Sequence, residues 1–333
     1  MEGERVAGRL IERVYHLDNG ADVHINNVRG SVHVIGTDGD KAHLHLEVDP
    51  EHRLSDAELV HAPIDLSWDD HQLSVKVVTE QIFQSWFEGR GGPPPILCTL
   101  YLPRQAQVAM STVSAESSVA NIEGPVRINT VSGNIVATEI EGSLHCNTVS
   151  GDAVVTHSTG TLHWNTVSGT LRVRQSSFEH LKGNAVSGAI VLELELMPAE
   201  GISSSTVSGD LRLLVPAGFG CQAQLTSMNG RAHIDLPVTV VEERRGRWEG
   251  RINDGGALVR LSSMSGSLYV TTSAQSSPGA EKPSSDVAAN RETELAILRQ
   301  IERREISIDE GLKRLGALHQ PAVEGEVGQY GAH

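Results

Sequence analysis

Residues 124–169 read GPVRINTVSGNIVATEIEGSLHCNTVSGDAVVTHSTGTLHWNTVSG, and the tetrad Thr-Val-Ser-Gly recurs in this stretch, ending at Gly133, Gly151 and Gly169. These three glycines are 18 residues apart. A second glycine divides each interval in half, at Gly142 and Gly160, so the chain repeats in half-units of nine residues. Each half-unit is a short β-type run that ends at a glycine turn. A fixed short period of this kind predicts a stacked repeat fold.

The repeat extends beyond this stretch with a looser period. Variants of the tetrad recur at residues 185–188 and 206–209, after intervals of 19 and 21 residues. Degenerate copies occur at residues 112–115, 227–230 and 263–266. We therefore expect repeats of about 18 to 21 residues from residue 111 to residue 271.

Aligning the repeats at 18 residues brings like residues into columns. The columns are Val126, Leu144 and Leu162; Val131, Val149 and Val167; Ile135, Ala153 and Leu171; and Ala137, Val155 and Val173. Two short strands per repeat cannot bury an apolar face alone, but stacked coils bury it continuously. The sequence therefore predicts an all-β chain that forms a parallel β-solenoid, or β-helix. We expect right-handed coiling from the handedness of parallel crossovers. The rival, an antiparallel sandwich, does not explain like residues in register.

An asparagine recurs just before each turn, at Asn129, Asn147, Asn165 and Asn184. In a stacked coil these side chains would form a ladder whose amides bond to the coils above and below. Arg127, His145 and His163 occupy one outward column of the same strands. A solvated strand face accounts for that column, so it requires no function.

Composition and charge limit the classes of function. With 27 basic and 42 acidic residues the formal charge is −15, which argues against nucleic acid as a partner. Three widely spaced cysteines fit neither a disulfide framework nor a zinc motif. No apolar run approaches the roughly 18 residues of a membrane span, and the first twenty residues lack the apolar core of a signal peptide. We expect a cytoplasmic protein, or one peripheral to a membrane.

The regions that flank the repeat differ from it in character. We expect residues 1–110 to form irregular opening coils of the solenoid. Residues 272–291 are rich in Ser, Ala and Pro and predict a flexible linker. Residues 292–319 predict a helical hairpin, whose second helix begins at a capping box from Ser307 to Glu310. Residues 320–333 show no pattern and predict a disordered tail.

Two groups of apolar residues are candidates for partner contacts. Phe83, Trp86 and Phe87 lie together in residues 82–95 and would cap the open end of the core or contact a partner or membrane. The apolar faces of the expected hairpin supply the second group, Leu298, Ile301, Leu312 and Leu315. Two helices this short cannot fold stably alone, so we expect them to dimerise, to dock on a partner or to pack against the solenoid.

The chain resembles the bacterial DUF4097 family of adhesin-like β-strand repeat proteins over roughly residues 15–271. The resemblance rests on residues 18–48, on the strand from Leu100 to Pro103 and on the TVSG series. Residues 297–318 are similar to a short helical hairpin of the SHOCT type. The resemblance implies a β-repeat fold without established catalytic residues, and a surface, scaffold or envelope-stress role. For the hairpin it implies oligomerisation or other contacts.

Residues that could carry chemistry also have a plainer interpretation. His24, His33, His43 and His45 could hold a metal, but all four occupy the alternating polar positions of a solvated strand face. Asp152 and Asp210 follow tetrads too far apart for a paired-carboxylate site. We therefore expect no catalytic residue, no cofactor and no metal.

Residues 242–248, EERRGRW, occupy a long gap between two turn motifs. They would form an inserted hairpin or loop, either solvated or in contact with an anionic partner. The residues together predict a non-catalytic scaffold or interaction protein that binds protein partners, or itself, through the hairpin or the solenoid ends. The alternatives are a sensor that binds a glycan, lipid or peptide on its solenoid face and, third, a polysaccharide-acting enzyme.

Overall fold

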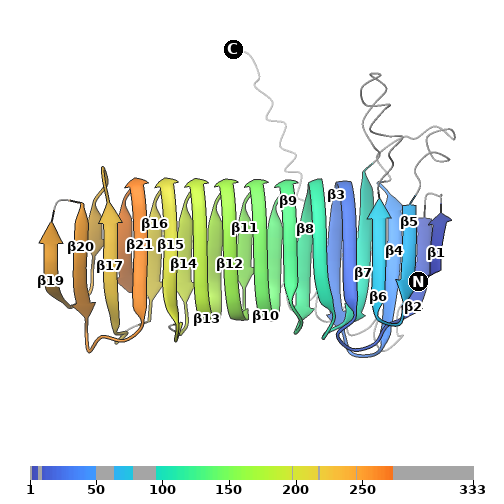
Figure 1. Cartoon of the computed structure of the whole chain (residues 1–333), viewed down its shortest axis with the longest axis horizontal. Coiled ribbons are helices and arrows are strands. Elements are labelled where there is room, and N and C mark those ends of the chain that lie inside the picture. The colour runs from blue at the N-terminus through green and yellow to red at the C-terminus, as the bar shows by residue number, and fades with distance from the viewer. Residues whose placement is uncertain are drawn as a thin grey trace, which may run out of the picture. The chain divides into compact units, whose positions relative to one another are not determined.

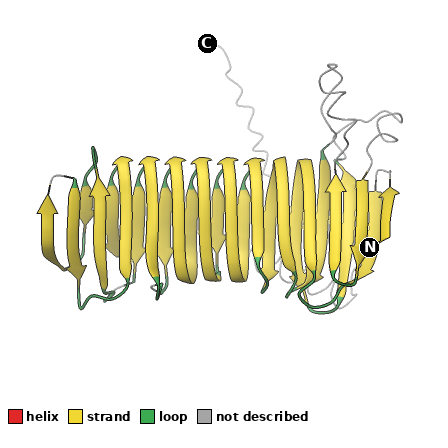
Figure 2. Cartoon of the chain, in the orientation of Figure 1, coloured by secondary structure: helices red, strands yellow, loops and turns green. Residues whose placement is uncertain are grey.

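The computed structural model describes residues 2–6, 10–49, 64–77, 95–196, 198–216, 218–244 and 246–272. Every regular element in these ranges is a strand (Figure 2). The expected linker, helical hairpin and tail, residues 273–333, lie outside the described ranges, as do Phe83, Trp86 and Phe87. The chain divides into two units at Ser276 and Ser277, and the strands all belong to the first.

The repeat region forms a stack of parallel coils (Figure 1). Its strands are β8 (Gln107–Ile122), β9 (Val126–Ser132), β10 (Ile135–Ser150), β11 (Ala153–Thr156), β12 (Thr159–Ser168), β13 (Leu171–Ser187), β14 (Ile190–Leu194), β15 (Gly201–Ser208) and β16 (Leu211–Val215). Ile135 pairs with Ala153, and Leu144 pairs with Leu162, both in parallel. The predicted 18-residue register is therefore confirmed, and the antiparallel sandwich is excluded for these coils.

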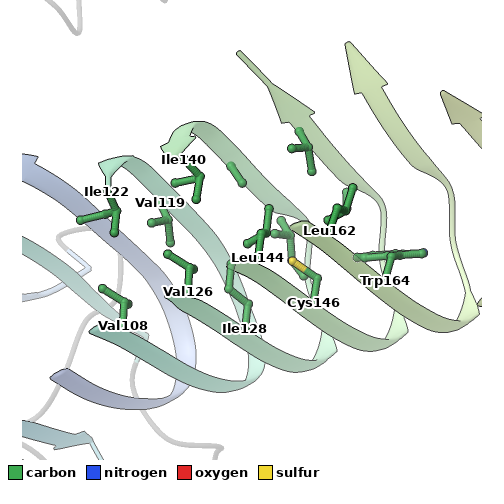
Figure 3. Packing of buried hydrophobic residues seen from close by; sticks show 14 of the residues in the cluster. Val108, Val119, Ile122, Val126, Ile128, Ile140, Leu144, Cys146, Leu162 and Trp164 are labelled. Carbon is green, nitrogen blue, oxygen red and sulfur yellow. The ribbon is translucent and has the colours of Figure 1, made fainter. Parts of the chain in front are cut away.

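Each coil contributes to two parallel sheets. The first half of β10 pairs with β8 and β11 in what we call sheet 1, and its second half pairs with β9 and β12 in sheet 2. Ile140 from one half and Leu144 and Cys146 from the other are completely buried in the core between them (Figure 3). Three of the four predicted columns lie in this core.

Glycine makes the corner between the coils possible. Gly133, Gly151 and Gly169 have φ between 143° and 147°, a conformation that residues with a side chain rarely adopt. A Cβ on Gly151 would also collide with the carbonyl oxygen of Gly133 in the coil below. Stacked backbones therefore need glycine at this position of every regular coil.

The C-terminal coils do not stack in chain order. The strands here are β17 (Cys221–Ser227), β18 (Ala232–Ile234), β19 (Val238–Arg244), β20 (Arg247–Ile252), β21 (Leu258–Ser265) and β22 (Leu268–Thr272). β21 pairs in parallel with β15 on one side and with β17 on the other. Likewise, β22 pairs with both β16 and β18. The last coil of the chain thus fills a position between two earlier ones.

The expected insertion at residues 242–248 is a hairpin. β19 and β20 pair antiparallel, and β20 pairs antiparallel with β17 at the end of the stack (Figure 1). Trp248 of β20 is partly buried and packs against the core. The hairpin therefore closes this end of the stack.

Antiparallel strands also close the other end. The elements here are β1 (Glu2–Val6), β2 (Leu10–His16), β3 (Asp22–Thr37), β4 (Lys41–Val48), β5 (Ile64–Asp69), β6 (Gln72–Val77) and β7 (Ile96–Pro103). β3 forms a parallel coil between β8 and the pair β6 and β7. Outside it, β2, β4 and β7 form one antiparallel series, and β1, β5 and β6 form the other.

Candidate functional site

The outer face of sheet 2 carries three columns of side chains that run along the stack. It is built by the outward-facing residues of β9, β12, β15 and β21, of the first half of β8 and of the second halves of β10 and β13, which pair in register from coil to coil. Neighbouring coils are about 4.8 Å apart, and neighbouring columns, two residues apart on each strand, are about 7 Å apart. We call this surface the sheet 2 face.

The first column is basic. Its members are, in order along the stack, Arg127, His145, His163, Lys182, Ser203 and Arg260. The rings of His145 and His163 stack with centroids 4.6 Å apart, and His163 and His180 are 5.7 Å apart. Partial burial and the charge of Arg127 lower the pKa of His145. Partial burial and neighbouring His145, His180 and Lys182 lower the pKa of His163.

The second column is the predicted asparagine ladder, which the structure confirms. Nδ2 of Asn147 donates to Oδ1 of Asn129 at 2.9 Å, and Nδ2 of Asn165 donates to Oδ1 of Asn147 at 2.9 Å. Nδ2 of Asn184 continues the series to Oδ1 of Asn165 at 3.0 Å, and Ser205 ends it by donating to Oδ1 of Asn184. An amide has two N–H groups and two acceptor lone pairs, so each internal rung keeps one of each for solvent.

The third column is an exposed apolar ridge. Its valines are between 43% and 50% exposed: Val113, Val131, Val149, Val167, Val186 and Val207. Met264 and Met228 continue the column at 50% and 70% exposed. The sequence grouped Val131, Val149 and Val167 with the columns that fill the core, and this was wrong. The preceding threonine faces inward instead, as buried Thr130 and Thr148 show, because successive residues of a strand point to opposite faces.

The three columns of the sheet 2 face carry no negative charge over the described coils from β8 to β21. None of the outward positions of β9, β12, β15 and β21, or of residues 107–114 of β8, 143–150 of β10 and 180–187 of β13, is Asp or Glu. Exposed Glu141 of β10 lies at the corner before them, opposite Thr159. Carboxylates lie at the margins of this face: Glu200 is 4.0 Å from His180, and Glu249 accepts a hydrogen bond from Gln224, the neighbour of Arg260. A basic face on a chain of formal charge −15 is a marked local asymmetry.

The aspartates considered for catalysis hold the stack together. Oδ1 of Asp152 accepts a hydrogen bond from the backbone N–H of Thr170 at 2.7 Å, and Oδ1 of Asp210 accepts one from Ser267 at 2.9 Å. Each carboxylate therefore caps the start of a strand in the next coil. Their spacing leaves no paired-carboxylate site between them.

The three cysteines are shielded by burial, and His45 of the N-terminal strands is held by neighbouring glutamates. Burial raises the pKa of the Cys98, Cys146 and Cys221 thiols to about 12, so these thiols stay protonated. His45 contacts Glu12 at 3.2 Å and Glu47 at 3.9 Å. Within the ranges given above, no three His, Cys, Asp or Glu side chains are grouped so that they could hold a metal ion.

The predicted partner contacts, Phe83, Trp86, Phe87, Leu298, Ile301, Leu312 and Leu315, lie outside the described residues. The sheet 2 face was not among the predicted sites. Its signal was present in the sequence as the column of Arg127, His145 and His163, but Lys182 and Arg260 join that column only after intervals of 19 and 78 residues.

The family comparison matches residues 104–271 to the Toastrack DUF4097 family, half of the chain. The chain belongs to the Toastrack DUF4097 family. The Toastrack match runs from the residue after β7 to the penultimate residue of β22, and so includes every strand of the sheet 2 face. No helix in the described part of this Toastrack chain is long and apolar enough to cross a membrane.

Several solved structures are similar to this Toastrack chain at low identity. A proposed adhesin from Parabacteroides merdae is 13% identical with a TM-score of 0.42, over 79% of this chain and 96% of its own. A proposed lipid-binding protein from Parabacteroides distasonis is 14% identical with a TM-score of 0.44, over 79% of this chain and 97% of its own. A proposed adhesin from Bacteroides fragilis is 12% identical with a TM-score of 0.40, over 79% and 96%. No protein of curated function matches the sequence. No ligand or partner follows from likenesses this distant.

Proposed function

We propose that the chain is a non-catalytic interaction scaffold, in which a β-solenoid presents a regular wall of side chains to a partner. One observation carries this proposal. The sheet 2 face repeats the same three columns from coil to coil, and the Asn129–Asn184 ladder fixes its rungs to one another. Such an array suits a long partner better than a small substrate, because it offers equivalent contacts along the stack.

The surroundings of the reactive side chains support a role without catalysis. Asp152 and Asp210 are hydrogen-bonded to the backbone of the next coil, and the thiol of Cys146 is completely buried. A catalytic group must instead reach a substrate from a cleft, with a pKa matched to its task.

The finer parts of the proposal concern segments beyond β22. We propose that residues 292–319 form the SHOCT-like hairpin and supply a second contact, through Leu298, Ile301, Leu312 and Leu315. We further propose that the protein works in the cytoplasm or at a membrane surface, and fractionation of native cells would test this.

Cross-linked affinity capture from the native cell tests the scaffold function. The full chain is compared with a chain that ends at Thr272. Proteins that are captured by the full chain and lost on truncation would make the hairpin the recruiting element. Capture of the protein itself alone, by both chains, would favour self-assembly. A full chain that captures nothing, while turning over a substrate in a hydrolase screen, would contradict the proposal.

A further inference from the structure

The basic charge of the sheet 2 face favours a partner of negative charge. Among the described residues, no carboxylate lies within ion-pair distance of Arg127 or Lys182, whereas Arg104 and Arg247 both have such partners. Arg260 donates from Nε to the neutral Oε1 of Gln224 at 3.0 Å. These three cations share one column with two histidines, so the column attracts an anion.

The same column disfavours a second copy of the chain as the partner. Two sheet 2 faces brought together would bring basic columns to one interface, and the three columns of neither face contain a carboxylate to compensate them. An external anionic partner compensates them directly.

The other two columns narrow the class of anion. The internal rungs Asn147 and Asn165 each keep an N–H and a lone pair for solvent, and such groups bind hydroxyls. About 7 Å beyond them, the methyl groups of Val149 and Val167 form an apolar border that suits the C–H faces of sugar rings. Hydroxyls, C–H faces and charges at a regular interval are the features of an acidic polysaccharide.

Two other polyanions fit this face less well. Its outward positions include no Phe, Tyr or Trp over the seven described strands, and single-stranded nucleic acids need aromatic side chains for base stacking. An anionic membrane is bound through Trp, Phe or Leu beside clustered Lys and Arg, and on the sheet 2 face β9 to β13 offer only Arg127 and Lys182. The regular polar ladder between the charges and the valines has no use in either case.

We propose that the sheet 2 face binds a linear acidic polysaccharide lying along the solenoid axis. The carboxylates of the polysaccharide contact Arg127 and Lys182, its hydroxyls contact the asparagine ladder, and its ring faces lie against the valines. This inference rests on the proposed scaffold function and names its partner.

The histidines make the binding dependent on pH. His145 faces Arg127 on β9 and His163 on β12, and His163 also faces His180 and Lys182 on β13. Every charged neighbour of these rings on the adjoining strands is a cation or another imidazole, so a bound carboxylate favours the protonated rings. Binding therefore takes up protons and tightens as the pH falls from 8 to 6.

The test measures binding of the full chain to polygalacturonate at low ionic strength by calorimetry. The double variant Arg127→Gln/Lys182→Gln removes two cations from the sheet 2 face. Its matched control is Arg172→Gln/Arg174→Gln, which removes two exposed cations from the first half of β13, in sheet 1. We expect the first pair to raise the dissociation constant about tenfold or more and the second to leave it within about twofold. If the first pair alters the circular dichroism spectrum, Arg260→Gln replaces it.

Several results would overturn the proposal. These are the absence of binding, equal binding of fully methyl-esterified polygalacturonate, equal losses in both variant pairs, or tighter binding of phosphatidylglycerol vesicles or single-stranded DNA. The capture experiment tests the scaffold function separately from polysaccharide binding. If Arg127→Gln/Lys182→Gln still captures the same proteins from the cell, while no polygalacturonate binds, the scaffold function stands and the polysaccharide does not.

Discussion

At a corner of the stack, the presence or absence of a single atom, Cβ, decides which residue fits. Gly151 combines a φ of 144° with a backbone carbonyl from the neighbouring coil where a Cβ would stand. We expect Gly151→Ala to lower the free energy of unfolding by about 2 kcal/mol or more, since the conformation and the contact both oppose a side chain. Urea unfolding followed by far-UV circular dichroism measures this.

Gly183 provides the control, because its φ is not in the left-handed region and the nearest atom to a Cβ there is the rotatable hydroxyl of Ser204, at 3.1 Å. Gly183→Ala should cost much less than Gly151→Ala. Equal losses from the two substitutions would show that the corner conformation is not what requires glycine.

Trp164 contributes to the core by its volume and not by its polar atom. The side chain is completely buried (Figure 3), and its Nε1–H has no hydrogen-bond partner. Trp164→Phe removes that unsatisfied donor along with some apolar area, so the two effects oppose each other. We expect it to change the unfolding free energy by about 1 kcal/mol or less, and Trp164→Ala to cost about 3–5 kcal/mol. A Phe variant as unstable as the Ala variant would contradict the expectation that Phe retains most of the contribution of Trp164 to the core.

At the scale of the element, the stacked histidines of β10 and β12 make stability depend on pH. The pKa of His145 and of His163 is lowered in the folded chain, first by partial burial and then by neighbouring cations and imidazoles. Above the unfolded pKa of about 6.5 both states are neutral, and nothing is lost. As the pH falls below it, the unfolded chain takes up protons first, so stability decreases toward the folded pKa.

Urea midpoints at pH 8, 7, 6 and 5 check this prediction. We expect the midpoint to fall with pH more steeply for the natural chain than for His145→Gln/His163→Gln. Parallel pH profiles for the two proteins would show that the stacked rings carry no linked proton.

Elements also show where the sequence was sufficient and where it was not. Columns such as Val126, Leu144 and Leu162 could be predicted because their pairing follows the chain at a fixed interval. The position of β21 between β15 and β17 could not be, since that pairing joins residues that are not adjacent repeats. The outward direction of Val131 was missed because like residues in register form a column on either face of a strand. The sequence alone showed the part of the basic column formed by Arg127, His145 and His163. Its extension to Lys182 and Arg260 could be recognised only once the order of the coils was known.

At the scale of the whole stack, the strands at its two ends determine whether one molecule associates with another by edge pairing. A stack of parallel coils leaves unpaired backbone groups at its ends, and such edges promote association unless they are covered. The hairpin of β19 and β20 covers β17, where Leu225 lies opposite Trp248. Edge strand β2 at the other end carries charges at Glu12 and Arg13 among its exposed residues. Both ends thus have features that oppose strand addition.

Replacing residues 238–252 by a flexible Gly/Ser linker would uncover the edge of β17. Because that edge offers unpaired N–H and C=O groups beside the exposed core, we expect the variant to associate far more strongly than the natural chain, in a concentration-dependent way. Sedimentation velocity over a range of concentrations measures this. A control that keeps the hairpin but lengthens its turn at Gly246 should sediment as the natural chain does. If the linker variant sediments like this control, the hairpin of β19 and β20 is not what prevents end-to-end association of the stack.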